Sequence, residues 1–156
     1  MTIPFEYQRA SIEFERFMVS ARDAAGLATT NMAWNMVAGV LFTFRRRLTV
    51  EQGLRFASVL PPVLRALFID GWDFRSQPQP FGSREALTKE VQSLRSQHNF
   101  SPESSIASVA NALRGCVDVH AFEQVLGELP VGAAEFWAVG PPSAGSGAQA
   151  GEERVV

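Results

Sequence analysis

The chain contains 156 residues, of which 46 % are apolar and 19 % charged, and its formal net charge is −2. A chain of this length is the size of one domain and can bury about 68–70 % of the surface that its unfolded form exposes. The small net charge gives no overall field that would attract nucleic acid or an anionic membrane. The single cysteine excludes an internal disulfide and a cysteine-based zinc cluster.

The sequence predicts neither a secretion signal nor a membrane span. Residues 1–17 carry Glu6 where a signal peptide has basic residues, and they contain no uninterrupted apolar run. The longest apolar run, residues 36–44, is interrupted by Gly39 and Thr43 and is far shorter than the roughly 20 residues of a membrane span. We therefore expect a soluble cytoplasmic protein with no membrane partner.

Apolar residues in the first part of the chain recur every three or four positions, which is the spacing of one helix face. The stripe of the first helix consists of Tyr7, Ala10, Phe14, Phe17, Met18, Ala21 and Ala25. Gly26 is expected to end this helix. A second helix is predicted from Thr29 or Thr30, either of which can cap it, to about Arg47. Its inward face consists of Met36, Val37, Val40, Leu41 and Phe44.

Three consecutive arginines, Arg45, Arg46 and Arg47, fall in the last turn of the second helix. Positive charge at that end offsets the helix dipole, which favours a solvated helix end as the interpretation. The alternative is a site for phosphate, nucleic acid or an acidic partner. Nucleic-acid binding is not expected, because such surfaces spread basic residues along a whole face.

A capping-box pattern at Thr49-Val50-Glu51-Gln52 predicts a third helix over about 50–60. Its inward residues are expected to be Val50, Leu54, Ala57 and Leu60. Pro61-Pro62 breaks this helix and suits the first turn of a fourth one, over about 62–69. The inward residues of that helix are expected to be Val63, Leu64, Leu67 and Phe68.

Residues 70–82 hold prolines and glycines without a helical period, which is typical of a connection. We expect the connection to pack along the surface, because it contains Trp72, Phe74 and Phe81. Asp70 and Asp73 could serve acid–base chemistry or hold Mg²⁺. We favour structural roles instead, with Asp70 in the turn after the fourth helix and Trp72 as an anchor.

The pattern of helices resumes at Ser83, a predicted N-cap, with a stripe that consists of Leu87, Val91 and Leu94. Ser101-Pro102-Glu103 predicts the next helix start, and Asp118 is the predicted N-cap of the one after it. The inward residues of these two helices are expected to be Ile106, Val109, Ala110, Leu113, Val119, Phe122, Val125, Leu126 and Leu129. Residues 141–156 lack large apolar side chains apart from two final valines and are predicted to be a disordered tail.

The two histidines and the cysteine give little support for a chemical site. His98 continues the stripe of its helix, where a histidine is usually a hydrogen-bonded core residue. His98 and His120 lack the spacing of metal ligands, so no metal is expected. Cys116 follows Arg114 at a helix C-terminus and is expected to be an unreactive thiol.

The chain repeats part of its own sequence. Leu60-Pro61 recurs as Leu129-Pro130, a shift of 69 residues, and residues 37–71 align with 106–140 without an insertion. Further identical pairs at this shift are Ala38 with Ala107, Val40 with Val109, Arg45 with Arg114, Val50 with Val119 and Gly71 with Gly140. Such a unit has an apolar face that it cannot bury alone, so the repeat predicts architecture rather than chemistry.

Three runs carry a resemblance to a known family: FRRRLTVEQGLRFASVLPPVLRALFIDGWD (44–73), PFGSREALTKEV (80–91) and ALRGCVDVHAFEQVLGELPVGAAEFW (112–137). Together they resemble a bacterial all-α domain of unknown function, number two-two-six-seven, over about residues 5–139. The resemblance implies two tandem helical repeats that close on similar elements, here 60–68 and 129–137. It implies no catalytic or ligand residues. The second repeat departs from the pattern at 132–134, where the residues are smaller.

The sequence therefore predicts an all-α single domain, residues 1–140, of two pseudo-symmetric repeats with about eight helices. Repeat one covers about 5–70, the linker about 71–82 and repeat two about 83–139. The first functional hypothesis is a non-enzymatic module that binds a protein partner or forms a homo-oligomer. The alternative is a ligand-binding protein or enzyme with a pocket between the repeats. No catalytic residue, metal or cofactor is predicted, and the candidate binding residues are Arg45, Arg46, Arg47, Asp70, Trp72, His98 and Arg114.

Overall fold

A computed structural model describes residues 1–140, and this part of the chain forms helices and no strand. The all-α prediction is thereby confirmed. The helices are α1 (Phe5–Gln8), α2 (Ala10–Ala25), α3 (Thr30–Arg45), α4 (Val50–Ser58), α5 (Pro62–Ile69), α6 (Arg84–Ser93), the 3₁₀ turn η1 (Ser96–His98), α7 (Ser105–Arg114), α8 (Val119–Glu128) and α9 (Ala133–Phe136). The predicted disordered tail, residues 141–156, lies outside the described residues.

Local chemistry sets most of the helix ends where the sequence predicted them. The hydroxyl of Thr29 and the carboxylate of Asp118 accept hydrogen bonds from main-chain N–H groups in the first turns of α3 and α8. Thr49 forms the predicted capping box with Gln52 at 2.9 and 3.2 Å. Gly26 ends α2 with a φ of +68°, a conformation that costs glycine little.

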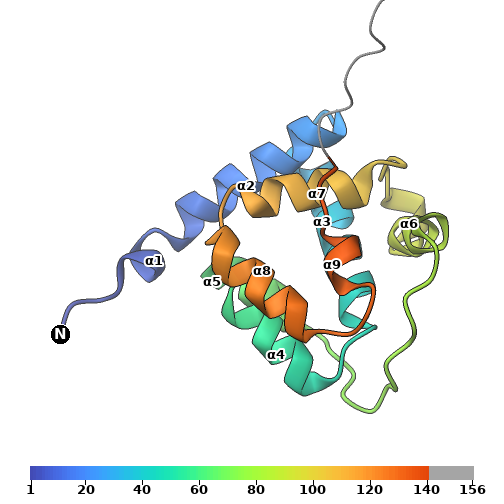
Figure 1. Ribbon diagram of the computed structural model, residues 1–156. Coiled ribbons are helices and arrows are strands. Elements are labelled where there is room, and N and C mark those ends of the chain that lie inside the picture. The colour runs from blue at the N-terminus through green and yellow to red at the C-terminus, as the bar shows by residue number, and fades with distance from the viewer. Residues whose placement is uncertain (141–156) are drawn as a thin grey trace, which may run out of the picture.

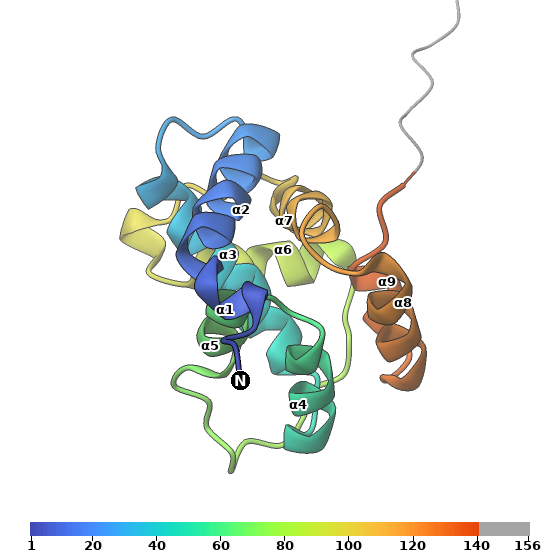
Figure 2. The ribbon, with the colours of Figure 1, turned by 90° about the vertical axis from the view of Figure 1, so that its left-hand side faces the viewer.

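Helix α3 lies at the centre of the fold and packs against α2, α5, α6 and α7 (Figure 1). Helices α2 and α7 lie side by side, while α4 packs on α5 and α8. Figure 2 shows α8 and α9 together along one side of the molecule. Residues from both halves of the sequence thus enclose one interior.

The interior is a single cluster of buried apolar residues with an aromatic centre. The ring centroid of Phe44 lies 5.1 Å from that of Phe136 and 5.3 Å from that of Trp137. The ring of Phe56 lies 5.8 Å from that of Phe122. Aromatic pairs in such geometry contribute about 0.5–1.5 kcal/mol each beyond the burial of their area. Neither half would keep this cluster without the other.

The inward face of α4 differs from the prediction. Leu54 is 54 % exposed, whereas Phe56 is fully buried beside Ala57. The spacing in the sequence is compatible with either face, and tertiary packing selects the one that contains Phe56. Trp72 lies directly over Gly53, where a Cβ atom would overlap its ring, so this side of α4 faces the linker.

The predicted start of the helix after Ser101 is also wrong. Helix α7 begins at Ser105 and not just after Ser101. The Asn99 side chain accepts hydrogen bonds from the main chain and hydroxyl of Ser101, and it donates to the carbonyls of Val91 and Leu94 at 2.8 Å. This turn buries Ser101 and engages its hydroxyl with Asn99, and the N-cap position of α7 is Ser104 instead.

The first helix and two predicted inward residues also need correction. The predicted first helix divides into α1 and α2 at Arg9. Val63 is only half-buried and Val119 is exposed, because α5 and α8 present their other apolar residues to the core.

The linker packs on the body at its two ends. Trp72 covers α4, and Phe81 lies 5.9 Å from Phe44 and against Gly132. Gly132 has a φ of +102° and has no room for a Cβ atom, because the Phe81 ring occupies that space. Phe74 is exposed, which differs from the expected packing of all three linker aromatics.

Candidate functional site

The solvated helix end predicted for the three arginines is wrong for two of them. Arg45 and Arg47 are only 9 % and 8 % exposed. The Nη1 group of Arg45 donates to the carbonyl oxygens of Phe68 at 2.9 Å and Asp70 at 2.7 Å. Arg45 thereby ties the end of α3 to the end of α5 and the start of the linker.

Aromatic rings enclose the guanidinium of Arg45. Its central carbon lies 4.3 Å from the ring centroid of Phe42 and 5.5 Å from that of Trp72. Burial lowers the pKa of Arg45 from its ordinary value, and the neighbouring charge of Arg46 lowers it further, while Asp70 opposes the shift. Arg45 is therefore a buried cation whose contacts are mainly carbonyls and rings.

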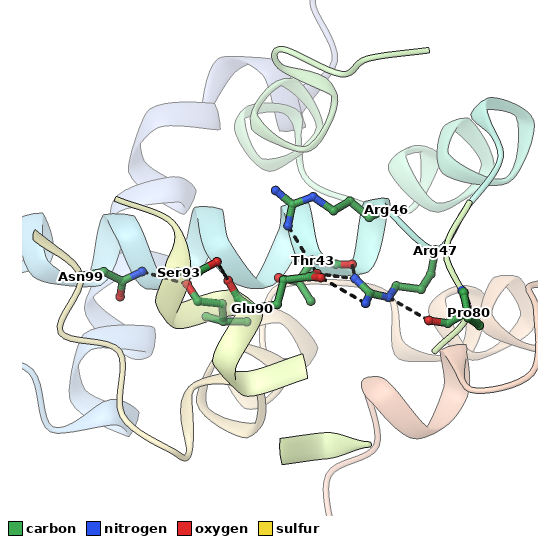
Figure 3. Close-up of polar contacts among 8 residues, drawn as sticks. Thr43, Arg46, Arg47, Pro80, Glu90, Ser93 and Asn99 are labelled. Carbon is green, nitrogen blue, oxygen red and sulfur yellow. Dashed lines mark hydrogen bonds and ion pairs between the residues drawn. The ribbon is translucent and has the colours of Figure 1, made fainter. Parts of the chain in front are cut away.

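Arg47 connects α3 to α6 and to the end of the linker (Figure 3). It donates to the carbonyls of Thr43 at 2.8 Å and Pro80 at 3.4 Å. Its two terminal nitrogens also pair with the Glu90 carboxylate, with Nη2 and Oε1 at 3.2 Å. Such bidentate pairing fixes orientation as well as charge. Arg47 is thus a structural residue with few donors left for a ligand.

Arg46 differs from its two neighbours because its side chain is 46 % exposed. Its Nη1 lies 3.4 Å from Oε2 of Glu90, the carboxylate that Arg47 also uses (Figure 3). The carbonyl of Arg46 accepts a hydrogen bond from Gln79 at 2.9 Å, which fixes the far end of the linker.

The linker and the end of α3 enclose a pocket of about 240 Å³, which we call the arginine pocket. Its lining residues are Arg45, Arg46, Leu48, Gly71, Trp72, Asp73, Ser76, Gln77 and Gln79. Of the candidate binding residues, Arg45, Arg46 and Trp72 line it directly, and Asp70 contributes the carbonyl that holds Arg45.

The other three candidate residues, Arg47, His98 and Arg114, do not line this pocket. His98 is exposed in η1 and not on the apolar stripe, because the chain leaves α6 at Leu94 and turns. Arg114 lies at the end of α7, where it donates to the Trp137 carbonyl at 3.0 Å and the Glu123 carboxylate at 2.5 Å. The seven candidates therefore do not form one site.

A groove of about 440 Å³ beside α1 was missed in the sequence. It is lined by Phe5, Glu6, Arg9, Glu13, Ser58, Val59, Leu60, Pro61, Pro62, Arg65, Cys116, Val117, Asp118 and Ala121. We call it the α1 groove. Its walls come from both predicted repeats, and only the proline pair at its centre is a clear signal in the sequence.

The polar groups of the α1 groove serve mostly structural roles. Arg65 donates to the carbonyls of Ala57 at 3.2 Å and Leu60 at 2.9 Å, at the end of α4. Burial, with a smaller contribution from the charge of Glu13, raises the pKa of Cys116 to about 12. A thiol that holds its proton in this way is a poor nucleophile at neutral pH. The groove therefore offers surface for binding and no apparatus for covalent catalysis.

Neither a metal centre nor a membrane-spanning helix is present in the part of the chain that the structure describes. Residues 1–140 contain no group of three histidine, cysteine, aspartate or glutamate side chains that could hold a metal ion. None of the helices described is long and apolar enough to cross a bilayer.

Comparison with known protein families identifies the family of this chain. The model of a family described as "Uncharacterized conserved protein (DUF2267)" matches residues 14–136, which covers α3 to α9 completely and most of α2. No curated protein matches the chain.

Proposed function

The chain belongs to the uncharacterised conserved family DUF2267, whose description assigns no activity, and from the geometry we propose that it is a non-enzymatic module that self-associates. The surface that supports this proposal is α1 together with the α1 groove. No residue of α1 is buried, and Phe5 at its start is 68 % exposed. Large exposed apolar groups around a concavity are typical of protein-binding surfaces.

A second copy of the chain is the occupant that the charges favour. The groove carries both signs of charge, with Arg9 and Arg65 close to Glu6 and Glu13. A two-fold interface places the same patch on both subunits, so it must be complementary to itself. A patch that alternates acidic and basic groups around apolar residues meets this requirement, because a carboxylate of one copy can face an arginine of the other.

The proposal also includes that the chain consists of two similar helical units. Arg45 donates to the Phe68 carbonyl at 2.9 Å and Arg114 donates to the Trp137 carbonyl at 3.0 Å. Both bonds span 23 residues, and each partner pair is related by the 69-residue shift. These observations support two similar units, whose junction forms part of the α1 groove.

Location in the cytoplasm stays a prediction.

Sedimentation velocity over a range of protein concentrations tests self-association. We expect the wild-type chain to shift from monomer to dimer, and Phe5→Glu to stay monomeric, because a buried charge opposes association. Phe74→Glu is the matched control, since Phe74 is also 68 % exposed and lies away from the groove. A wild-type chain that stays monomeric at all concentrations overturns the proposal, as does an equal effect of both substitutions.

A second candidate function uses the same groove for a small apolar ligand. It is supported by the walls that the two predicted repeats contribute and by the volume of about 440 Å³, which is within the range of ligand sites. Native mass spectrometry of the purified chain separates the two functions. A mass a few hundred daltons above the monomer indicates a bound ligand, whereas a multiple of the chain mass indicates self-association.

A further inference from the structure

The two arginines related by the 69-residue shift differ in one respect. Each holds a carbonyl 23 residues further along the chain, but only Arg114 also pairs with a carboxylate, that of Glu123. The position equivalent to Glu123 in the first half is Leu54, which cannot accept a hydrogen bond. The first half therefore lacks the anion that balances the arginine in the second half.

The charge of the Asp70 carboxylate acts on Arg45 without forming an ion pair with it. Within residues 1–140, no carboxylate lies within ion-pairing distance of Arg45, whose hydrogen bonds go to two main-chain carbonyls. Its guanidinium is largely removed from water, and buried charges in proteins are normally paired. Arg45 thus lines the arginine pocket as a largely buried cation whose direct hydrogen bonds, among residues 1–140, go to carbonyls and not to a carboxylate.

The rest of the arginine pocket suits an anion that carries a flat apolar group. Arg46 adds a second guanidinium, which is accessible from solvent and whose Nη1 lies 3.4 Å from the Glu90 carboxylate. Trp72 provides an aromatic wall and is held in place by its position over Gly53. The Asp73 carboxylate also lines the pocket, but it accepts from the Arg75 N–H at 3.0 Å and the Ser76 hydroxyl at 3.2 Å.

The pocket is formed without a ligand, because both ends of its linker wall are fixed. The Asp70 carbonyl is bonded to Arg45, and the Gln79 N–H is bonded to the carbonyl of Arg46. Preformed donors bind an anion without a further cost of ordering. A volume of about 240 Å³ restricts the ligand to a small molecule.

We infer that the arginine pocket binds a small aromatic carboxylate. The carboxylate lies against Arg45 and Arg46, and the ring lies against Trp72. Arginine pairs bidentately with carboxylates, and a ring beside an indole gains from stacking. This binding is independent of self-association, since Phe5 and the α1 groove share no residue with the pocket.

Titration of the ¹⁵N-labelled full chain with benzoate, followed by NMR, tests the inference. We expect saturable shifts of the Trp72 indole N–H and of the linker amides. Arg46→Gln should weaken binding about tenfold or more, which is the usual effect of losing a charge-assisted hydrogen bond. Arg46 is chosen because its exposure lets the chain fold without it. The matched control is Arg55→Gln, an exposed arginine on α4 outside the pocket, which should bind benzoate like the wild type.

Inorganic phosphate and acetate are the comparison probes. Both should bind more weakly than benzoate, because neither can use Trp72. Benzoate shifts that do not saturate, or an affinity that Arg46→Gln leaves unchanged, overturn the inference. Phosphate or acetate binding as tightly as benzoate overturns the aromatic part of it and leaves a general anion site.

Discussion

The contact between Trp72 and Gly53 gives the sharpest prediction about stability. An alanine at position 53 places its Cβ atom inside the Trp72 ring, so the ring must leave its place on α4. Gly127 is also a helical glycine, in α8, but a Cβ atom there meets nothing within 4 Å. The two substitutions make the same chemical change in the same kind of element, and only one of them creates an overlap.

The magnitude follows from two opposing effects. Glycine to alanine within a helix stabilises by up to about 1 kcal/mol, because alanine has the higher helix propensity. Overpacking costs about 1–3 kcal/mol when a rigid neighbour has to move. Gly127→Ala should therefore raise the free energy of unfolding by up to about 1 kcal/mol, whereas Gly53→Ala should lower it by up to about 2 kcal/mol.

Urea unfolding followed by circular dichroism measures both variants against the wild type, with equal slopes required for the comparison. In thermal melts, a change of 1 kcal/mol in the free energy of unfolding shifts Tm by about 2–4 °C for a chain of this size. A Gly53→Ala variant as stable as Gly127→Ala would refute the reasoning, because it would mean that Trp72 does not hold the linker on α4.

Two further predictions concern buried polar groups. Arg47→Met should lower the free energy of unfolding by about 1–3 kcal/mol, because it leaves Glu90 with a single, longer ion pair to Arg46. The control is Arg16→Met on the exposed face of α2, which should change the free energy of unfolding by less than about 0.5 kcal/mol in the same urea experiment. The pKa of Cys116 rises from 9.0 to about 12, so its stabilising contribution is complete below pH 9 and is lost as the pH rises from 9 toward 12. Iodoacetamide should accordingly modify Cys116 slowly at pH 8.5 in the folded chain and rapidly in urea, as followed by mass spectrometry.

Helix ends could be read from the sequence because they depend on neighbouring residues. Thr49 caps α4 through Gln52, three positions away, and the same local logic applies to Thr29 and Asp118. The burial of Arg45 could not be read in this way. Its partners are carbonyls 23 and 25 residues away, and main-chain carbonyls leave no signature in a sequence.

The two concavities differ in how much of them could have been predicted. The arginine pocket contains three residues that attract notice by type, Arg45, Arg46 and Trp72, although the sequence did not predict a pocket in this place. The α1 groove forms where three distant segments meet, and its residues are individually ordinary. Sequence reasoning finds unusual side chains more readily than surfaces made by packing.

Ligand binding in the arginine pocket has a consequence for stability that thermal unfolding can measure. A ligand that binds only the folded chain stabilises it by RT ln(1 + [L]/Kd), which is about 1.4 kcal/mol at ten times Kd. For a chain of this size that corresponds to a rise in Tm of about 3–6 °C. Benzoate at that concentration should give this rise in the wild type at constant ionic strength, and acetate at the same concentration should give less. If benzoate and acetate raise Tm equally, the aromatic part of the inference is wrong. If Arg46→Gln responds like the wild type, benzoate acts as a general salt and not through the arginine pocket.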